Sequence, residues 1–132
     1  MIRITSEVVK KIFEQAKTEA PFEACGYLAG KNDRVEKYYP MTNVDKSEDH
    51  FLLDPKEQFE VLKEVRKEGF EILAVYHTHP ISPARPSAED IKLAYDSNMV
   101  YVIVSLLNKN CIIKAFKIKQ GMVTEEVLVV EG

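Results

Sequence analysis

Five consecutive apolar residues, Ile72-Leu-Ala-Val-Tyr76, stand near the middle of this 132-residue chain. The run is too short for a buried helix and is typical of a central β-strand that is covered on both faces. It leads into His77-Thr78-His79-Pro80, and we expect the strand to end at His77. A strand of this kind needs neighbouring strands beside it and helices over it, so the chain is restricted to a layered fold.

Three segments have the patterns of helices. Apolar residues recur at helical spacing over residues 6 to 19, with charged residues between them. An N-cap residue, a proline and a glutamate mark the start of a second helix over about 55 to 68, and Gly69 is placed to end it in a left-handed turn. Ser87 is predicted to open a third helix that runs through about Ser97.

The remaining apolar segments read as strands. Residues 26–30 and 34–39 predict a β-hairpin, and residues 40–50, rich in turn formers, predict an irregular loop. The C-terminal part predicts an antiparallel meander of strands 100–107, 111–118 and 123–130, with turns at 108–110 and 120–121. We therefore expect one α+β domain over residues 1–132, with a mixed β-sheet flanked by helices.

Charge and composition exclude several classes of partner. Eighteen Lys and Arg against twenty-one Asp and Glu give a net charge of −3 without a dense basic cluster, which argues against nucleic acid. The longest apolar stretch, residues 99–107, falls well short of the ~20 residues that span a bilayer, so we expect no membrane partner. Cys25 and Cys111 lie far apart in a chain whose first residues lack a secretory pattern, which predicts a reducing, cytoplasmic setting.

The most informative segment is His77-Thr78-His79, followed by Ser87 and Asp90. Alternate residues of an extended strand point to the same side, so His77 and His79 can present two imidazoles to one point. Asp90 lies in the first turn of the expected helix, where backbone N–H groups and the helix dipole favour an ionised carboxylate. Two neutral imidazoles and one carboxylate are the ligand set of a catalytic zinc site, which keeps a fourth position open to water.

Each of these residues also has a purely structural interpretation. A single histidine at a strand end usually meets solvent or a backbone carbonyl, but two in register with an aspartate favour the metal site. Ser87 and Asp90 are explained equally well as a helix cap and its third-position acid. Capping and chemistry are compatible, because the same geometry fixes where the hydroxyl and the carboxylate point.

A zinc hydrolase also needs a group that carries protons. Glu23 is the best local candidate among the acidic residues, because it lies in an apolar segment rather than on a charged face. From the residues alone, this function and a plain role in a helix-to-strand turn are equally supported. His50 is interpreted as a solvated loop residue, and Cys25 as a buried strand cysteine, with a redox or inhibitory role near the metal as the alternative.

Together, His77-Thr-His79-Pro80, Ser87, Asp90 and the upstream Glu23 resemble the JAMM (MPN+) metalloprotease family, over nearly the whole chain and with no motif position missing. The resemblance implies a JAMM/MPN fold similar to that of cytidine deaminases. It implies one zinc ion per chain, held by His77, His79 and Asp90. In this family pattern Glu23 is the general base and then the acid, and Ser87 donates a hydrogen bond to the oxyanion.

The chain resembles the compact prokaryotic members of that family. The resemblance implies hydrolysis of a peptide or isopeptide bond that follows the C-terminal diglycine of a ubiquitin-like or sulfur-carrier protein. Three alternatives stay open: a metal-free MPN-type scaffold, a zinc peptidase for small peptides, and a zinc deaminase, although the Pro-Cys-x-x-Cys of deaminases is absent. A homodimer paired through an apolar edge strand is a further possibility.

Overall fold

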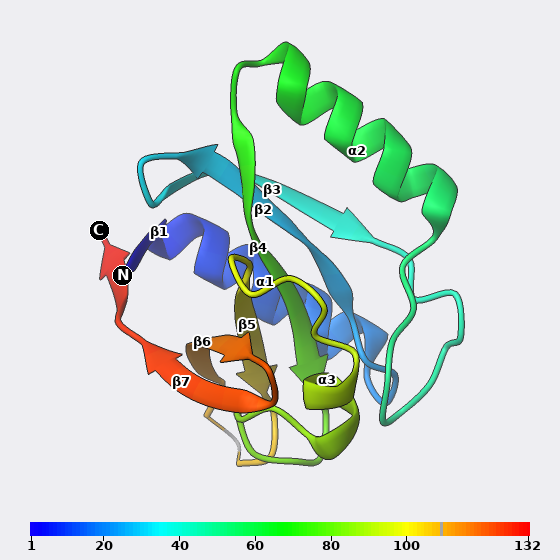
Figure 1. The fold of residues 1–132 in the computed structure, drawn as a ribbon. Coiled ribbons are helices and arrows are strands. Elements are labelled where there is room, and N and C mark those ends of the chain that lie inside the picture. Colours follow the sequence, from blue (N-terminus) through cyan, green and yellow to red (C-terminus); the bar gives the residue numbers. More distant parts are fainter. Residues whose placement is uncertain (109) are drawn as a thin grey trace.

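A strongly curved, mixed sheet organises the part of the chain that the computed structural model describes, residues 1–108 and 110–132 (Figure 1). Eight strands follow in the order β7-β6-β5-β4-β2-β3-β1-β8, with parallel pairs at β4–β5, β1–β3 and β1–β8 and antiparallel pairs elsewhere. The strands are β1 (Ile2–Thr5), β2 (Cys25–Lys31), β3 (Arg34–Met41), β4 (Glu71–His79), β5 (Val100–Ser105), β6 (Ile112–Lys119), β7 (Met122–Glu126) and β8 (Leu128–Glu131). The helices are α1 (Ser6–Glu19), α2 (Pro55–Lys67) and α3 (Ala88–Lys92). The expected α+β class is confirmed.

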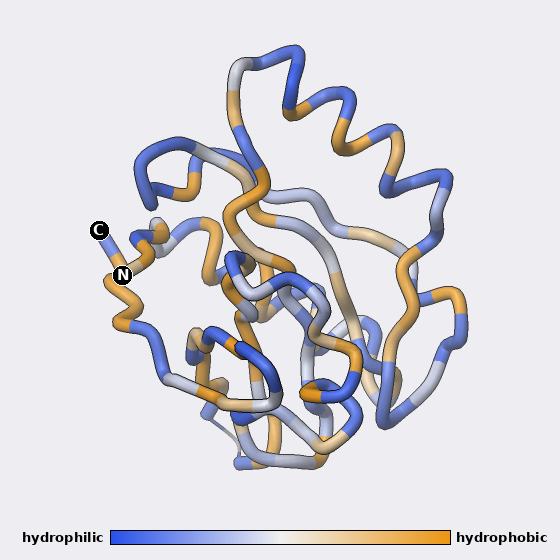
Figure 2. Tube along the Cα trace, viewed as in Figure 1, coloured by the Kyte–Doolittle hydropathy of each residue, from blue (hydrophilic) through white to orange (hydrophobic). Residues whose placement is uncertain are grey.

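The helices α1 and α2 lie on opposite faces of the sheet. Val9, Ile12 and Ala16 of α1 are buried in the main core with Ala74 and Tyr76 of β4. A smaller cluster around Val75, on the other face of β4, receives α2 through Val61. Figure 2 shows the corresponding alternation of hydrophilic and hydrophobic residues along α2. Both faces of β4 are therefore covered, as the apolar run predicts.

Both long helices begin as their sequences predict. Thr5 accepts a hydrogen bond from the N–H of Val8 at the start of α1, and Asp54 accepts one from the N–H of Lys56 at the start of α2. Gly69 follows α2 with a φ of 76°, the left-handed conformation expected of a C-terminal glycine. The β2–β3 hairpin is also confirmed, and its turn places Asn32 and Asp33 at positive φ.

The central strand is longer than expected. The prediction that it ends at His77 is wrong, because β4 continues to His79. His77, Thr78 and His79 pair with Ile103, Val104 and Ser105 of the parallel neighbour β5, and all three β4 residues are buried. The sheet ladder therefore continues past the apolar run and fixes both histidines in regular backbone.

Helix α3 is shorter than expected. The predicted end near Ser97 is wrong, since α3 stops at Lys92. Beyond it Leu93 is 46% exposed and Tyr95 is 86% exposed, so continuing the helix buries nothing. Asp96 instead accepts a hydrogen bond from the N–H of Asn98 and starts the turn into β5.

The two ends of the chain also differ from expectation. The prediction of one strand over 123–130 in a simple meander is wrong: β7 ends at Glu126, and β8 leaves the meander to pair in parallel with β1. The N–H of Ile2 donates to the carbonyl of Val127, where the two strands separate. Strand β1 was missed altogether, although Ile2 and Ile4 are 1% exposed. Its four residues are too few for a periodic signal.

The turn expected over 108–110 includes residue 109, which lies outside the described residues. No helix in the described ranges is long and apolar enough to cross a membrane.

Candidate metal centre

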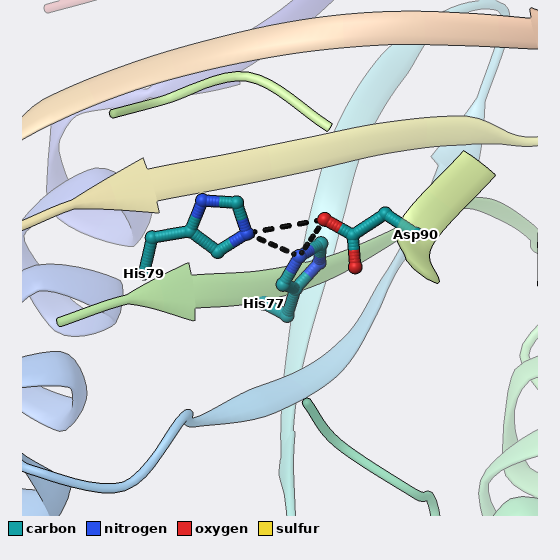
Figure 3. A group of neighbouring side chains, drawn as sticks. All are labelled: His77, His79 and Asp90. Atoms are coloured by element: carbon teal, nitrogen blue, oxygen red, sulfur yellow. Dashed lines mark hydrogen bonds and ion pairs between the residues drawn. The ribbon is translucent and has the colours of Figure 1, made fainter. Parts of the chain in front are cut away.

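Three side chains that the sequence singles out meet at the end of β4. His77 and His79 project from the same face of β4, and Asp90 reaches them from the first turn of α3 (Figure 3). The pleat of the strand turns the intervening Thr78 to the other face. One possible ligand atom from each of the three lies within 4.8 Å of the others. The pleat of the strand and the start of the helix therefore place two imidazoles and a carboxylate around one point.

The protonation of His79 makes its Nε2 available as a ligand. Nδ1 of His79 lies 2.8 Å from the carbonyl oxygen of Pro83, which can only accept, so the neutral ring carries its proton on Nδ1. Its Nε2 then presents a lone pair toward Oδ2 of Asp90 at 3.1 Å and Nε2 of His77 at 3.0 Å. Two lone-pair atoms facing each other at this distance repel unless a proton or a metal ion lies between them.

Asp90 is held as a carboxylate. Burial opposes its charge, but His77 and His79 in their proton-donating forms attract the carboxylate and donate to it, and these effects outweigh burial. The pKa of Asp90 is therefore far below its ordinary value. The backbone N–H of Ser87 also donates to Oδ2 of Asp90 at 2.9 Å. This hydrogen bond is half of a capping box that orients the carboxylate oxygen toward the histidines.

His77 is the most deeply buried of the three. Burial lowers its pKa and so favours the neutral ring, the form that binds metals. Its ring stacks on Phe51, with centroids 4.7 Å apart and an interplanar angle of 25°. Its Nδ1 is buried without a hydrogen-bond partner among the described residues. His79 differs: burial again opposes the charged ring, but Asp90 and the Pro83 carbonyl raise its pKa, so a metal ion competes there with a proton.

The donor set fits zinc. Two imidazole nitrogens and one carboxylate oxygen are ligands that zinc takes at catalytic sites. Ligand atoms in a tetrahedral zinc site lie ~3.3 Å apart, given bonds of ~2.0 to 2.1 Å. The three atoms here are separated by 3.0 to 3.1 Å. A cation is accommodated by movements of a few tenths of an ångström, and it satisfies the lone pairs that otherwise oppose each other.

Glu23 lies in the segment just before β2 and is only 2% exposed. Burial raises the pKa of its carboxyl to about 8, with a lowering influence from His79 and a raising one from Asp90. Oε1 of Glu23 is buried and has no hydrogen-bond partner within the described ranges. The charges of His79 and Asp90 therefore reach the carboxyl group, which can hold or release a proton near neutral pH.

Thr78 helps to place the Glu23 segment beside the histidines. Its hydroxyl accepts a hydrogen bond from the N–H of Ala24 at 2.8 Å, and its own N–H donates to the carbonyl of Ala24 at 3.0 Å. The sequence analysis did not assign this role. From the sequence, a threonine between two candidate ligands indicates only that its side chain lies on the opposite face of the strand.

Ser87 occupies the N-cap of α3. Its Oγ accepts a hydrogen bond from the N–H of Asp90 at 3.0 Å, which confirms the cap predicted from the sequence. The hydroxyl proton is not consumed by this interaction, because a hydroxyl both accepts and donates. Capping thus leaves Ser87 able to donate a hydrogen bond beside the metal centre.

A largely apolar cavity of about 470 Å³ extends from His77 and Asp90. Its walls come from β2, the loop before α2 and the segment after α3. Aromatic and aliphatic side chains predominate, among them Tyr27, Phe51, Leu52, Leu93, Tyr95 and Tyr101. The sequence analysis missed these residues because they are scattered over the chain and converge only in the fold. The cavity offers an extended, apolar segment of a substrate a place directly beside the centre.

Two further residues named from the sequence are placed by the structure. Cys25 is fully buried, and burial raises the pKa of its thiol to about 12, so the thiol stays protonated and the core interpretation is favoured. His50 lies in the loop before α2, as expected, with 36% of its side chain exposed. Its ring contacts the carboxylates of Asp45 and Asp49 at 3.0 Å each, and it borders the apolar cavity.

Comparison with known proteins gives a consistent result. Residues 5–119 match the model of the prokaryotic homologs of the JAB domain. The CysO-cysteine peptidase of Mycobacterium tuberculosis strain H37Rv is 36% identical over 126 residues, which cover 93% of this chain and 86% of that protein. A Thermus thermophilus protein named "Probable TtuB-protein conjugate cleaving protease" is 44% identical over 77 residues, covering 58% of this chain and 51% of its own.

Solved structures agree with this fold. A solution structure of a protein from Desulfitobacterium hafniense superposes with a TM-score of 0.92 at 40% identity, covering 99% of this chain and 93% of its own. A JAB1/MPN domain protein from Archaeoglobus fulgidus superposes with a TM-score of 0.68 at 23% identity, covering 99% of this chain and 100% of its own. The second likeness identifies the fold as JAB1/MPN, as the sequence resemblance implies.

Proposed function

Because this chain belongs to the family of prokaryotic homologs of the JAB domain, we propose that it is a zinc metallopeptidase whose metal ligands are His77, His79 and Asp90. The observation that carries the proposal is the convergence of Nε2 of His77, Nε2 of His79 and Oδ2 of Asp90, which lie 3.0 to 3.1 Å apart. They lie beside Glu23, whose buried Oε1 has no hydrogen-bond partner among the described residues. We propose one zinc ion per chain, which the single group of possible ligands found among the described residues supports.

Glu23 is the proton carrier in this proposal. When bound, zinc supplies a Lewis acid and lowers the pKa of a coordinated water toward ~7. The Glu23 carboxylate accepts a proton from the attacking water and then donates it to the departing amine, so Glu23 is a carboxylate again at the end of the reaction. The cation's charge favours the ionised form of Glu23, which burial alone disfavours.

Ser87 stabilises the developing negative charge. Its hydroxyl is held by the cap of α3, in the same turn as Asp90, and donates a hydrogen bond to the oxyanion of the tetrahedral intermediate. A single donor of this kind is worth ~2.7 to 4 kcal/mol in other hydrolases.

The substrate that we propose is a ubiquitin-like or sulfur-carrier protein, cleaved after its C-terminal diglycine. Two relatives are named for related reactions, one on a CysO-cysteine bond and one on TtuB-protein conjugates. The apolar cavity next to His77 and Asp90 supports an extended tail approaching the centre, and glycines let such a tail pass without side-chain clashes. The leaving group is a lysine, a cysteine or a short peptide.

The expectations for domain organisation, cellular location and oligomeric state stay predictions. We propose that residues 1–132 act as one domain, since one continuous sheet joins both ends of the described chain. The cytoplasm remains the proposed location, in keeping with the free thiols of Cys25 and Cys111. A homodimer paired through the edge strands β7 or β8 can be tested by sedimentation equilibrium.

The decisive experiment uses a diglycine-tailed carrier protein fused to a short C-terminal peptide. The zinc-loaded enzyme is expected to cleave directly after the second glycine, as read by mass spectrometry, and a chelator is expected to abolish cleavage. Two matched controls are the His79→Ala enzyme and a carrier ending in Ala-Ala. Cleavage that survives chelation would contradict the metallopeptidase, and equal cleavage of the Ala-Ala carrier would contradict the diglycine preference.

A further inference from the structure

Asn43 lies in the loop between β3 and α2, is 4% exposed and uses its whole amide group. Its Nδ2 donates to the carbonyls of Glu23 at 3.0 Å and His50 at 3.1 Å. Its Oδ1 accepts from the N–H groups of Asp45 at 3.2 Å and Leu52 at 3.1 Å. Reversing the amide would set all four contacts donor to donor or acceptor to acceptor, so its orientation is unambiguous.

These contacts join the segment that contains Glu23 to the loop over residues 43–53. The loop is closed on itself by the side chain of Asn43 and by the backbone hydrogen bond from Val44 to Leu52 at 2.9 Å. The loop also accepts a hydrogen bond from the N–H of Glu23 through the carbonyl of Ser47 at 2.8 Å. Both backbone polar groups of Glu23 are therefore held by this one loop.

The same loop touches the metal centre. Phe51 of this loop stacks on the ring of His77. Ala24, the residue that follows Glu23 in the sequence, donates a hydrogen bond from its N–H to the hydroxyl of Thr78 in β4. Glu23 thus lies between two supports, the loop and the strand that contains the two histidines. Because Oε1 of Glu23 has no hydrogen-bond partner within residues 1–108 and 110–132, no side-chain hydrogen bond of that atom fixes the carboxyl, and the hydrogen bonds of the backbone do more to place it. Proton transfer needs such a group within about 0.5 Å of its productive place.

We propose that Asn43 is a positioning residue for the reaction, which acts through the backbone carbonyl of Glu23 to hold its carboxyl against the metal centre. The inference rests on the proposed function, because it assumes that Glu23 transfers the proton. Asn43 itself makes no contact with the three candidate ligands among the hydrogen bonds of the described residues. Its effect should therefore be on the rate of the chemical step rather than on zinc binding.

The test is a double-mutant cycle with the diglycine fusion as substrate. Asn43→Asp keeps the accepting oxygen and removes the donor to the carbonyls of Glu23 and His50. We expect kcat to fall at least about tenfold, KM to change less than about threefold, and zinc content per folded chain to stay unchanged. In the Glu23→Gln background the same substitution should change the residual rate less than about twofold, since the group it positions is already lost. Asn32→Asp, at the exposed turn of the β2–β3 hairpin, is the matched control and should leave every value unchanged.

The outcomes separate this inference from the proposed function. A fully active Glu23→Gln enzyme would overturn the role of Glu23 itself. A Glu23→Gln enzyme with only a small residual rate, together with an unaffected Asn43→Asp enzyme or with equal fold losses in both backgrounds, would overturn only the role of Asn43.

A measurement on the unmodified protein covers the case in which Asn43→Asp does not fold. The amides of Glu23, Asp45 and Leu52 should share one free energy of opening in native-state hydrogen exchange, because one side chain and one loop hold all three. Exchange of the Glu23 amide that is independent of the Leu52 amide would refute the link.

Discussion

The carboxyl group of Glu23 lies in a buried environment that disfavours its ionised form. The side chain is 2% exposed, its Oε1 lacks a partner among the described residues, and burial raises its pKa from 4.5 to about 8. A residue chosen only for stability at this position would be uncharged. The cost makes sense if the carboxyl must change protonation state during the reaction, since groups with such pKa values cluster at active sites.

This cost predicts that Glu23→Gln stabilises the metal-free protein as the pH rises. Below pH ~4.5 the carboxyl is protonated in both the folded and the unfolded chain, so the substitution should change little. Between pH 4.5 and 8 the unfolded chain releases a proton that the folded chain keeps, and wild-type stability falls. Above pH 8 the full penalty applies, on the order of 5 kcal/mol at ~1.4 kcal/mol per pH unit.

Urea unfolding of chelator-treated proteins at pH 5 and pH 9 measures the difference. The exposed Glu48→Gln substitution is the control and should show no comparable dependence on pH. A Glu23→Gln protein that is no more stable than wild type at pH 9 would show that the buried charge is not strained.

The ligand candidates were predictable because each depends on local geometry. His77 and His79 lie two residues apart, so the pleat of a strand places them on one face, and the first turn of a helix places the carboxylate of Asp90. Glu23 lies 54 residues before His77, and only its apolar neighbours and the family resemblance indicated it. Asn43 gave no signal at all, because an asparagine in a polar loop is ordinary until the fold brings it to Glu23.

Among the elements, α3 shows how a five-residue helix can serve a site without contributing to the core. None of its residues is buried, and its start is fixed by the reciprocal hydrogen bonds between Ser87 and Asp90. These bonds orient the carboxylate and the serine hydroxyl together. If Ser87 and Asp90 act as proposed, stability and chemistry depend on the same cap, and a substitution that separates the two roles is informative.

Ser87→Gly is such a substitution. Glycine is nearly as good as serine at an N-cap, costing only a few tenths of a kcal/mol, but it has no hydroxyl. We expect zinc content and the melting temperature to stay close to wild type, and kcat to fall ~10²-fold through loss of the oxyanion donor. Ser87→Thr keeps a hydroxyl and should retain most of the activity. Full activity in Ser87→Gly would reduce Ser87 to a cap.

The boundaries of the elements were harder to predict than their types. Helices α1 and α2 have strong caps and long periodic faces, and their predicted limits differ from the structure by a residue at most. Strand β4 and helix α3 have ends set by tertiary contacts. The ladder with β5 extends β4 to His79, while the absence of anything to pack against ends α3 at Lys92. Neither cause is visible in the local pattern.

For the molecule as a whole, the curved sheet brings together segments that are remote in sequence. The loop before α2, the residues after β4 and helix α3 all lie at the end of β4 where the histidines stand (Figure 1). Of the three candidate ligands, two lie in the sheet and one lies in the small, exposed α3. A metal ion at this point would therefore attach the exposed helix α3 to the buried part of β4.

Metal removal should accordingly lower stability, and the loss should be uneven. A ligand that binds only the folded chain adds ~2.7 kcal/mol at a hundredfold excess over Kd and ~4.1 kcal/mol at a thousandfold excess. For a domain of this size, that corresponds to a fall in melting temperature on the order of 10 °C when zinc is chelated. Hydrogen exchange should speed up in α3 and in residues 80–87 long before it does in β4 and β5, because α3 has no buried residue to hold it.

The His79→Ala protein loses one ligand but keeps the fold, so its melting temperature should not respond to zinc or to chelator. An equal response in that variant would assign the stabilisation to zinc bound elsewhere, and uniform exchange over the whole chain would show that α3 is not fastened by the metal.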